Sequence, residues 1–214
     1  MKQLESNDYF GRSYDTKERF IGYWHQINEV VGLNPTKVLE IGIGSGFISK
    51  YLKERKINVI TLDIKKELKP DVCGSILTLP FANNSFDVVA CYEVLEHLPY
   101  ENFPKAISEI FRVSKSYTIL SIPDANKFCR LFVQIPKIVS FKKIIPLTRL
   151  KNPVHKLDYE EEHYWEIGKA GYPLSKIIKD IKMAGFKVEK TYRIFEHPYH
   201  RFFKLDNSKD VSKI

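Results

Sequence analysis

Short runs of apolar residues alternate along this chain with stretches in which apolar residues recur every three or four positions. The short runs predict buried strands, and the periodic stretches predict amphipathic helices. The predicted strands lie at 38–41, 58–63, 71–73, 86–91, 117–122, 187–194 and 200–205. The predicted helices lie at 16–31, from 47 onward, at 101–113 and at 174–184. This alternation predicts an α/β fold in which right-handed helical crossovers join parallel strands.

The strand at 38–41 leads into a glycine-rich turn, which is the clearest indication of a ligand in this chain. The turn reads Lys37-Val-Leu-Glu-Ile-Gly-Ile-Gly-Ser-Gly46, and apolar residues at helical spacing follow from Phe47. Glycine adopts positive φ without strain and lets the backbone approach a ligand closely. A ligand is therefore expected above this turn. The alternative is a tight strand-to-helix turn that binds nothing.

The third glycine narrows the kind of ligand. A dinucleotide fingerprint, G-x-G-x-x-G, requires glycine at position 47, where this chain has Phe47. The spacing here is G-x-G-x-G, which disfavours a nicotinamide-dependent oxidoreductase. Glu40 precedes the first glycine and would suit a ligand with a cationic amine, whereas it would repel phosphates.

Three further segments follow in order. Asp63 ends the strand at 58–63, 63 − 40 = 23 positions after Glu40. An acidic residue about 20 positions beyond the glycine loop is well placed to accept hydrogen bonds from ribose hydroxyls. Next come Leu79-Pro-Phe81 with the strand after it, and then Tyr92-Glu-Val-Leu-Glu-His-Leu98.

With these four segments, residues 37–98 resemble the class I S-adenosylmethionine-dependent methyltransferases, in particular their small-molecule type (methyltransferase type 11-like). The resemblance implies a Rossmann-like three-layer sandwich with a seven-stranded, mostly parallel sheet whose last strand is antiparallel. It also implies a methyltransferase (EC 2.1.1.-) with S-adenosylmethionine as cofactor and S-adenosylhomocysteine as product. In relatives an aspartate is common in the place of Ser75, and serine would bind the adenine amino group with less charge assistance. The implied cofactor-binding residues are Glu40, Gly42, Gly44, Gly46, Phe47, Asp63, Ile64, Ser75, Ile76, Cys91, Tyr92 and Glu93.

Composition fits one enzyme domain over residues 1–214. The chain has 43% hydrophobic residues, which argues against disorder, and 214 residues suffice for one α/β core. It lacks an apolar run of about eighteen residues, and its first residues are too polar for a secretory signal, so a cytoplasmic protein is expected. Its three cysteines have no metal-ligand spacing, and no metal site is predicted.

Two parts of the chain are predicted to surround the site. A helix at 16–31, ended by Gly32, is expected to cover the cofactor edge. Its apolar residues fall on one side: Phe20, Tyr23, Trp24, Ile27 and Val31. A basic, apolar insertion or lid is expected at about 125–167.

The segment 125–157 of this insertion contains eight cationic residues and no Asp or Glu, and the net charge of the chain is +8. It could lie at a membrane interface, close over an acidic or lipid-like acceptor, or pack against the domain with its lysines in water. Nucleic acid is not expected as a partner, because the cations alternate with aliphatic rather than stacking aromatic residues.

The acceptor side is less well marked. His97, His155 and His163 are the nearby bases that titrate near neutral pH, and His163 is the candidate catalytic residue. A structural role remains open for His163 and is favoured for His97. The stretch 196–203 is a further candidate border of the acceptor pocket.

The predicted function is methyl transfer to an O, N or C atom of a small-molecule or glycan/lipid-type acceptor. A non-catalytic subunit that binds an adenosyl ligand is the alternative. The sequence indicates neither the acceptor nor the oligomeric state, because this type of fold serves many acceptors.

Overall fold

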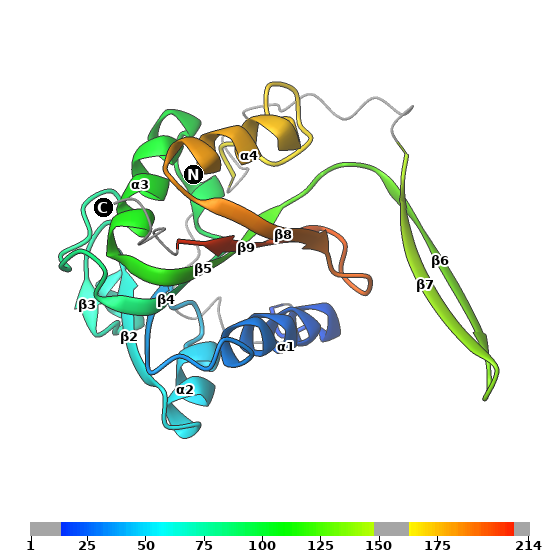
Figure 1. The fold of residues 1–214 in the computed structure, drawn as a ribbon, viewed down its shortest axis with the longest axis horizontal. Helices are drawn as coiled ribbons and strands as arrows, with labels where there is room; N and C mark the ends of the chain where they lie inside the picture. Colours follow the sequence, from blue (N-terminus) through cyan, green and yellow to red (C-terminus); the bar gives the residue numbers. More distant parts are fainter. Residues whose placement is uncertain (1–13, 148–162, 208–214) are drawn as a thin grey trace, which may run out of the picture.

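The computed structural model describes residues 14–147 and 163–207 and contains one seven-stranded sheet (Figure 1). The strand order is β3-β2-β1-β4-β5-β9-β8. Strands β1 to β5 pair in parallel, and β9 lies antiparallel between β5 and β8. The predicted fold class, with its antiparallel last strand, is therefore confirmed. The strand bounds are β1 (Lys37–Ile41), β2 (Asn58–Asp63), β3 (Val72–Cys73), β4 (Phe86–Tyr92), β5 (Ser114–Pro123), β8 (Lys187–Arg193) and β9 (His200–Asp206).

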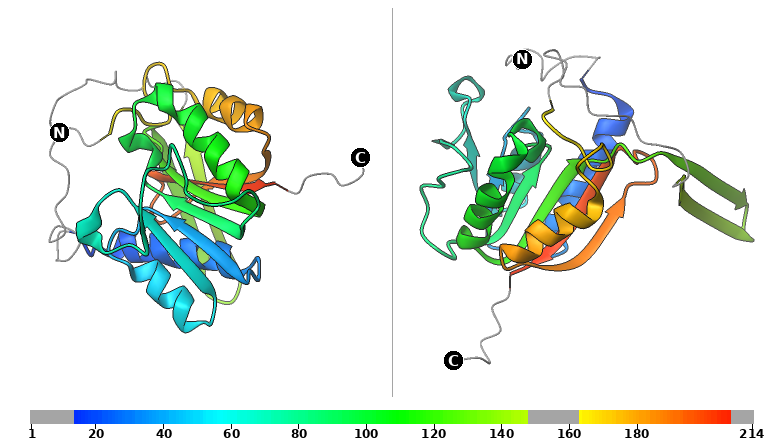
Figure 2. Two further views of the ribbon diagram at one scale, coloured as in Figure 1. Left: turned by 90° about the vertical axis from the view of Figure 1, so that its left-hand side faces the viewer. Right: turned by 90° about the horizontal axis from the view of Figure 1, so that it is seen from above.

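Helices cover both faces of this sheet, as Figure 2 shows. Helices α1 (Lys17–Val31) and α2 (Phe47–Glu54) pack on one face, and α3 (Phe103–Val113) and α4 (Leu174–Met183) pack on the other. Each face has its own apolar cluster, and β4 contributes to both. The central strands are consequently apolar on both sides, which explains why they appear in the sequence as continuous apolar runs.

The N-terminal helix ends at Gly32, as predicted, but its buried side differs from the predicted apolar side. Phe20 and Trp24 are 47% and 60% exposed. The buried residues are Gly22, Gln26 and Val30. Gly22 lies against His200 of β9, and a Cβ atom there would lie 3.9 Å from Nδ1 of His200, which is an ordinary contact. Of the predicted apolar side, Tyr23, Ile27 and Val31 pack partly buried against the apolar cluster on this face of the sheet.

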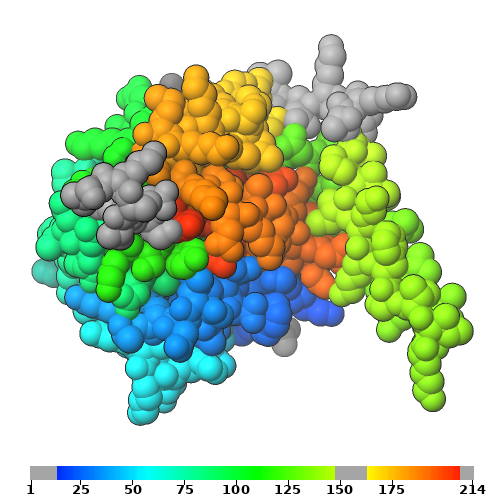
Figure 3. Space-filling model, in the orientation of Figure 1, coloured from blue at the N-terminus to red at the C-terminus, as the bar shows by residue number. Residues whose placement is uncertain are grey.

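The first part of the basic insertion forms a β-hairpin that the sequence did not predict. Strands β6 (Phe128–Ile135) and β7 (Val139–Pro146) pair with each other in a separate two-stranded sheet. Figures 1 and 3 show the hairpin projecting from the rest of the molecule. Residues 148–162, which include His155, lie outside the described residues. Within the described ranges, no helix is both long enough and apolar enough to cross a bilayer.

Candidate active site

A cavity of about 330 Å³ lies at the carboxyl ends of β1, β2 and β4, with α1 along one side. This is where ligands bind in open α/β sheets. Ten of the twelve predicted cofactor-binding residues line the cavity: Glu40, Gly42, Gly44, Phe47, Asp63, Ile64, Ser75, Ile76, Tyr92 and Glu93. The other two do not line it, because Gly46 is the N-cap of α2 and Cys91 is fully buried in the core.

The glycine loop has the backbone conformation that its sequence predicted. Gly42, Gly44 and Gly46 have φ values of 84°, 50° and 71°. A Cβ atom on Gly42 would lie 2.3 Å from Cγ2 of Val94. Gly42 is therefore required both for its positive φ and for the space beside Val94.

Asp63 is held at the end of β2 by two backbone amides. Its Oδ2 accepts a hydrogen bond from Ile43 N at 3.0 Å, and its Oδ1 accepts one from Lys65 N at 2.9 Å. Each carboxylate oxygen can accept a further hydrogen bond. The residue thus fits a ligand that presents two neighbouring hydroxyl groups, as a ribose does.

Glu40 lies in β1 and is only 2% exposed. Burial raises the pKa of Glu40 to about 8, and hydrogen bonds from Ser49 oppose this shift only in part. Its Oε2 has no hydrogen-bond partner in the described part of the chain. A buried, unpartnered carboxylate on a cavity wall fits a cationic donor such as the ammonium group of an amino acid.

Aromatic residues form the side of the cavity next to α1. The rings of Tyr23 and Phe47 stack with their centroids 4.9 Å apart, and Phe20 meets Phe47 edge-on at 5.6 Å. The Tyr23 hydroxyl lies 3.4 Å from Oγ of Ser45 in the glycine loop. Phe47, which excludes the dinucleotide fingerprint, therefore links the loop to α1. We call Glu40, the glycine loop and Asp63 the cofactor end of the cavity.

The opposite end contains acidic and histidine side chains that come from distant parts of the sequence. Glu93, His97 and His200 line the cavity there. Glu93 has an unusual φ of 52°, and its Oε2 lies 3.6 Å from Nε2 of His200. Glu96 and His163 lie directly behind His97. We call this group of five residues the histidine end.

His163, the candidate catalytic residue, does not line the cavity. Its Nδ1 lies 3.1 Å from Oε1 of Glu166. Burial acts to raise the pKa of Glu166, but hydrogen bonds from His163, Tyr199 and Lys169 lower it to about 2. Glu166 therefore orients the His163 ring. Glu166 was not among the predicted site residues. Its position three residues after His163 is the one signal in the sequence that could have indicated this contact.

Comparison with known proteins agrees with this fold. The sequence model described as "Methyltransferase domain" matches residues 39–122. An uncharacterized protein of Methanocaldococcus jannaschii is 31% identical over 172 residues, which cover 75% of each chain. The demethylmenaquinone methyltransferase of Renibacterium salmoninarum is 33% identical over 99 residues, 41% of this chain and 40% of that protein.

Solved structures show the same architecture. The N-methyltransferase NodS from Bradyrhizobium japonicum, in complex with S-adenosylhomocysteine, superposes with a TM-score of 0.63 at 12% identity, over 95% of this chain and 94% of that one. The fold is thus that of the Rossmann-like methyltransferases. The chain belongs to the class I S-adenosylmethionine-dependent methyltransferases. The cofactor of that family is S-adenosylmethionine, as the sequence predicted.

Proposed function

We propose that this protein transfers the methyl group of S-adenosylmethionine to an O, N or C atom of a small-molecule or glycan/lipid-type acceptor. The observation that carries the proposal is the pair of carboxylates at the cofactor end. In the proposal, Asp63 accepts hydrogen bonds from the ribose hydroxyls, and Glu40 receives the ammonium group of the methionine part. Ser75 and Ile76 border the adenine.

Bound S-adenosylmethionine would supply an activated methyl group, whose carbon–sulfur bond breaks as the acceptor atom bonds to the carbon and the electron pair stays on sulfur. The chain then has to align the acceptor at about 3 Å and exclude water. Tyr23 and Phe47 shield the cavity on the α1 side. His200 lines the cavity, whereas His163 does not, so His200 is better placed to take a proton from the acceptor.

Calorimetric titration with S-adenosylmethionine, S-adenosylhomocysteine and NADH tests the cofactor assignment. Asp63→Ala removes two charge-assisted hydrogen bonds to the ribose, each of which contributes about 1.5–3 kcal/mol, so we expect affinity to fall about 100-fold or more. Asp71→Ala is the matched control. Asp71 also accepts hydrogen bonds from a β2 residue, Thr61, but it does not line the cavity.

Two results would contradict this proposal. Binding of NADH but of neither adenosyl ligand would indicate a nicotinamide-dependent oxidoreductase. Equal affinity of wild type and Asp63→Ala for S-adenosylmethionine would remove Asp63 from the site. An acceptor screen that follows S-adenosylhomocysteine release then separates the enzyme from a non-catalytic adenosyl-binding subunit, which would bind the cofactor and release no product. A cytoplasmic location stays a prediction.

A further inference from the structure

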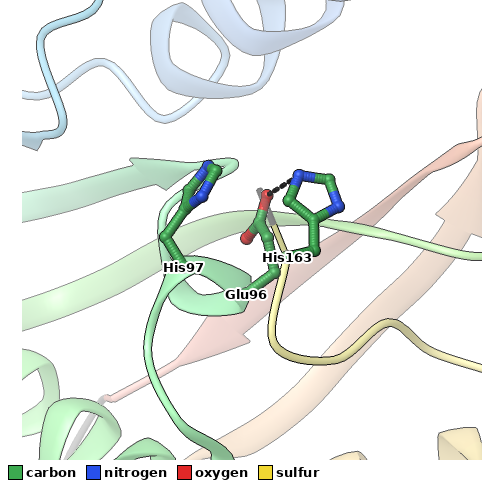
Figure 4. Close-up of side chains that lie close together, drawn as sticks. All are labelled: Glu96, His97 and His163. Carbon is green, nitrogen blue, oxygen red and sulfur yellow. Dashed lines mark ion pairs between the residues drawn. The ribbon is translucent and has the colours of Figure 1, made fainter. Parts of the chain in front are cut away.

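Behind the cavity wall, three potential metal ligands come together from two parts of the chain. Glu96 and His97 belong to the 3₁₀ helix η3 (Leu95–His97), and His163 begins the next described segment. Figure 4 shows the Glu96 carboxylate between the two histidine rings. One ligand atom from each residue lies within 4.8 Å of the others. The backbone hydrogen bond from Tyr164 N to Glu96 O, at 2.9 Å, fixes the two segments together.

Glu96 is the unusual member of this group. Its side chain is completely buried, and neither carboxylate oxygen has a hydrogen-bond partner among the described residues. The Oε1 of neighbouring Glu93 is likewise buried without a partner. An isolated buried carboxylate is costly unless it is protonated, paired or bound to a metal. Both oxygens of Glu96 and one oxygen of Glu93 would therefore be stabilised by a cation between these side chains.

The two histidines offer complementary nitrogen ligands. Since Nδ1 of His163 donates to Glu166, its Nε2 keeps a lone pair, and this atom lies 4.0 Å from Oε1 of Glu96. Metal-bound histidines usually donate their other ring nitrogen to a carboxylate in this way. Two ligand atoms each about 2.1 Å from one zinc ion lie about 3–4 Å apart. The Glu96–His163 separation of 4.0 Å lies at the upper end of this range, and the 4.8 Å that encloses all three ligand atoms would have to contract by about 1 Å on metal binding.

We propose that Glu96, His97 and His163 bind a divalent transition-metal ion such as Zn²⁺. Three protein ligands leave at least one coordination position for another molecule, as in catalytic zinc sites. Of the three ligands only His97 lines the cavity, and the proposal places the open position on the cavity side of His97. The following role rests on the proposed function. A bound metal would supply a Lewis acid that lowers the pKa of an acceptor hydroxyl. The proton would pass to His200 as the oxygen bonds to the methyl carbon and the electron pair of the C–S bond stays on sulfur.

Direct metal binding tests this site without an activity assay. Untagged wild-type protein titrated with Zn²⁺ should bind one equivalent, and Glu96→Gln and His163→Asn should each weaken binding at least about 10-fold. His197→Asn, which removes a histidine outside the cluster, should bind as the wild type does. Titration of S-adenosylmethionine into the same variants should give unchanged affinity, because neither residue lines the cofactor end.

The outcomes separate the two proposals. Failure of wild type to bind Zn²⁺, or equal binding by Glu96→Gln, overturns the metal site while S-adenosylmethionine binding still supports the enzyme. Stoichiometric Zn²⁺ binding without S-adenosylmethionine binding supports the metal site and removes its proposed role. A rise in melting temperature with Zn²⁺, present in wild type and lost in Glu96→Gln, checks that a folded protein is being compared.

A second inference rests on the projecting hairpin. In its register, paired residues share a face and neighbouring pairs alternate between the two faces. One face is directed to the rest of the molecule, since Arg130 donates to Glu196 O at 3.0 Å and Lys142 pairs with the Glu196 carboxylate at 2.8 Å. The other face is apolar apart from Lys143. Its exposed members are Leu131, Val133, Ile135, Val139, Phe141 and Ile145, each 39–46% exposed.

The charge of the hairpin indicates what covers this face. Residues 125–157 include no acidic residue. Lys137 and Ile138, which is 79% exposed, form the turn at the tip (Figure 3). Pairing with the same face of a second copy would bring these cations together. We infer that the hairpin docks on a membrane surface that contains anionic lipids, with its apolar face inserted at the headgroup boundary.

Vesicle flotation tests this interaction. Protein should float with vesicles of phosphatidylcholine and phosphatidylglycerol and should stay at the bottom with phosphatidylcholine alone. Val133→Glu, on the apolar face, should reduce the floated fraction at least about fivefold. Gln134→Glu adds the same charge one position along, on the other face, and should reduce it far less. Absence of flotation, equal loss in both variants, or a dimer that Val133→Glu dissociates would overturn the inference.

Discussion

The cofactor end and the histidine end of the cavity differ in how their carboxylates are partnered. At the cofactor end, two backbone amides hold Asp63, and only Glu40 has an unpartnered oxygen. At the histidine end, Glu93 and Glu96 have buried oxygens without partners in the described chain. Backbone geometry therefore forms the first end in advance, whereas the second end requires a proton or a cation to complete it.

Glu166→Gln tests how much the ionised carboxylate beside His163 stabilises the protein. Of the stability and affinity changes expected here, its effect is the largest. The pKa of Glu166 is lowered from 4.5 to about 2, so its contribution is present above pH 4.5 and is lost as pH falls through 2. A shift of this size corresponds to about 3 kcal/mol, which the variant should lose at pH 7. Denaturant unfolding between pH 2 and 7 measures it.

The matched control is Glu189→Gln. Its carboxylate pairs with Lys204 at 2.8 Å but is 42% exposed. An exposed ion pair contributes at most about 1 kcal/mol. If both variants were equally stable at pH 7, Glu166 would contribute no more to stability than an exposed ion pair does.

Gly42→Ala tests whether backbone geometry determines the cofactor end. Positive φ costs an alanine about 1–2 kcal/mol, and the clash with Val94 adds to it, so we expect cofactor affinity to fall about 30-fold. Gly74→Ala is the control, because Gly74 also lines the cavity and its added Cβ would meet its nearest atom at 3.5 Å. Calorimetric titration compares them. Equal affinities would mean that the loop adapts to its ligand.

Glu40 should make cofactor binding depend on pH. Because its pKa is raised to about 8, Glu40 is protonated in the free protein at pH 7, and a ligand ammonium group must displace that proton. Affinity should rise up to about 10-fold per pH unit until about pH 8 and then level off. Titrations in buffers of different ionisation enthalpy count the released proton. Glu40→Gln should release none, and a wild type that also releases none would contradict the assignment.

Tyr23→Leu has the smallest expected effect. It removes the ring that stacks on Phe47 and the hydroxyl beside Ser45, so cofactor affinity should fall by about 0.5–1.5 kcal/mol, or roughly 3- to 10-fold. Trp24→Leu changes the next residue of α1, which is 60% exposed and does not line the cavity, and should leave affinity unchanged. If Trp24→Leu had the larger effect, α1 would act through stability and not through the cavity wall.

The cofactor end was predictable because its residues follow directly from strand ends. Glu40, the glycines and Asp63 are fixed by β1 and β2, whose apolar runs are visible in the sequence. The contact between Glu96 and His163 joins residues 67 positions apart, and hydrogen bonds from Tyr164 N to Glu96 O and from Trp165 Nε1 to Leu98 O hold the two segments together. Single-sequence patterns do not encode such a contact, and the proposed metal site was therefore not predictable from the sequence.

The buried side of α1 and the β6–β7 hairpin also differ from what the sequence predicted. In α1, Phe20 and Trp24 of the predicted apolar side are exposed, whereas Gly22 and Gln26 are buried, and apolar periodicity alone does not predict the burial of a glycine and a glutamine. The hairpin residues 128–146 have apolar positions on both strands but no Asn-Gly or Asp-Gly turn, which is the strongest hairpin signal.

The position of β9 has a consequence for the order in which the chain is made. β9 lies between β5 and β8, although it is the last strand of the described chain. During synthesis, β5 emerges more than 70 residues before its partner, residues 200–206. One edge of the growing sheet therefore stays open for several seconds at about 5–20 residues per second. An open edge of this kind is where nascent chains pair wrongly, so this protein should depend on chaperones most while β5 waits for β9.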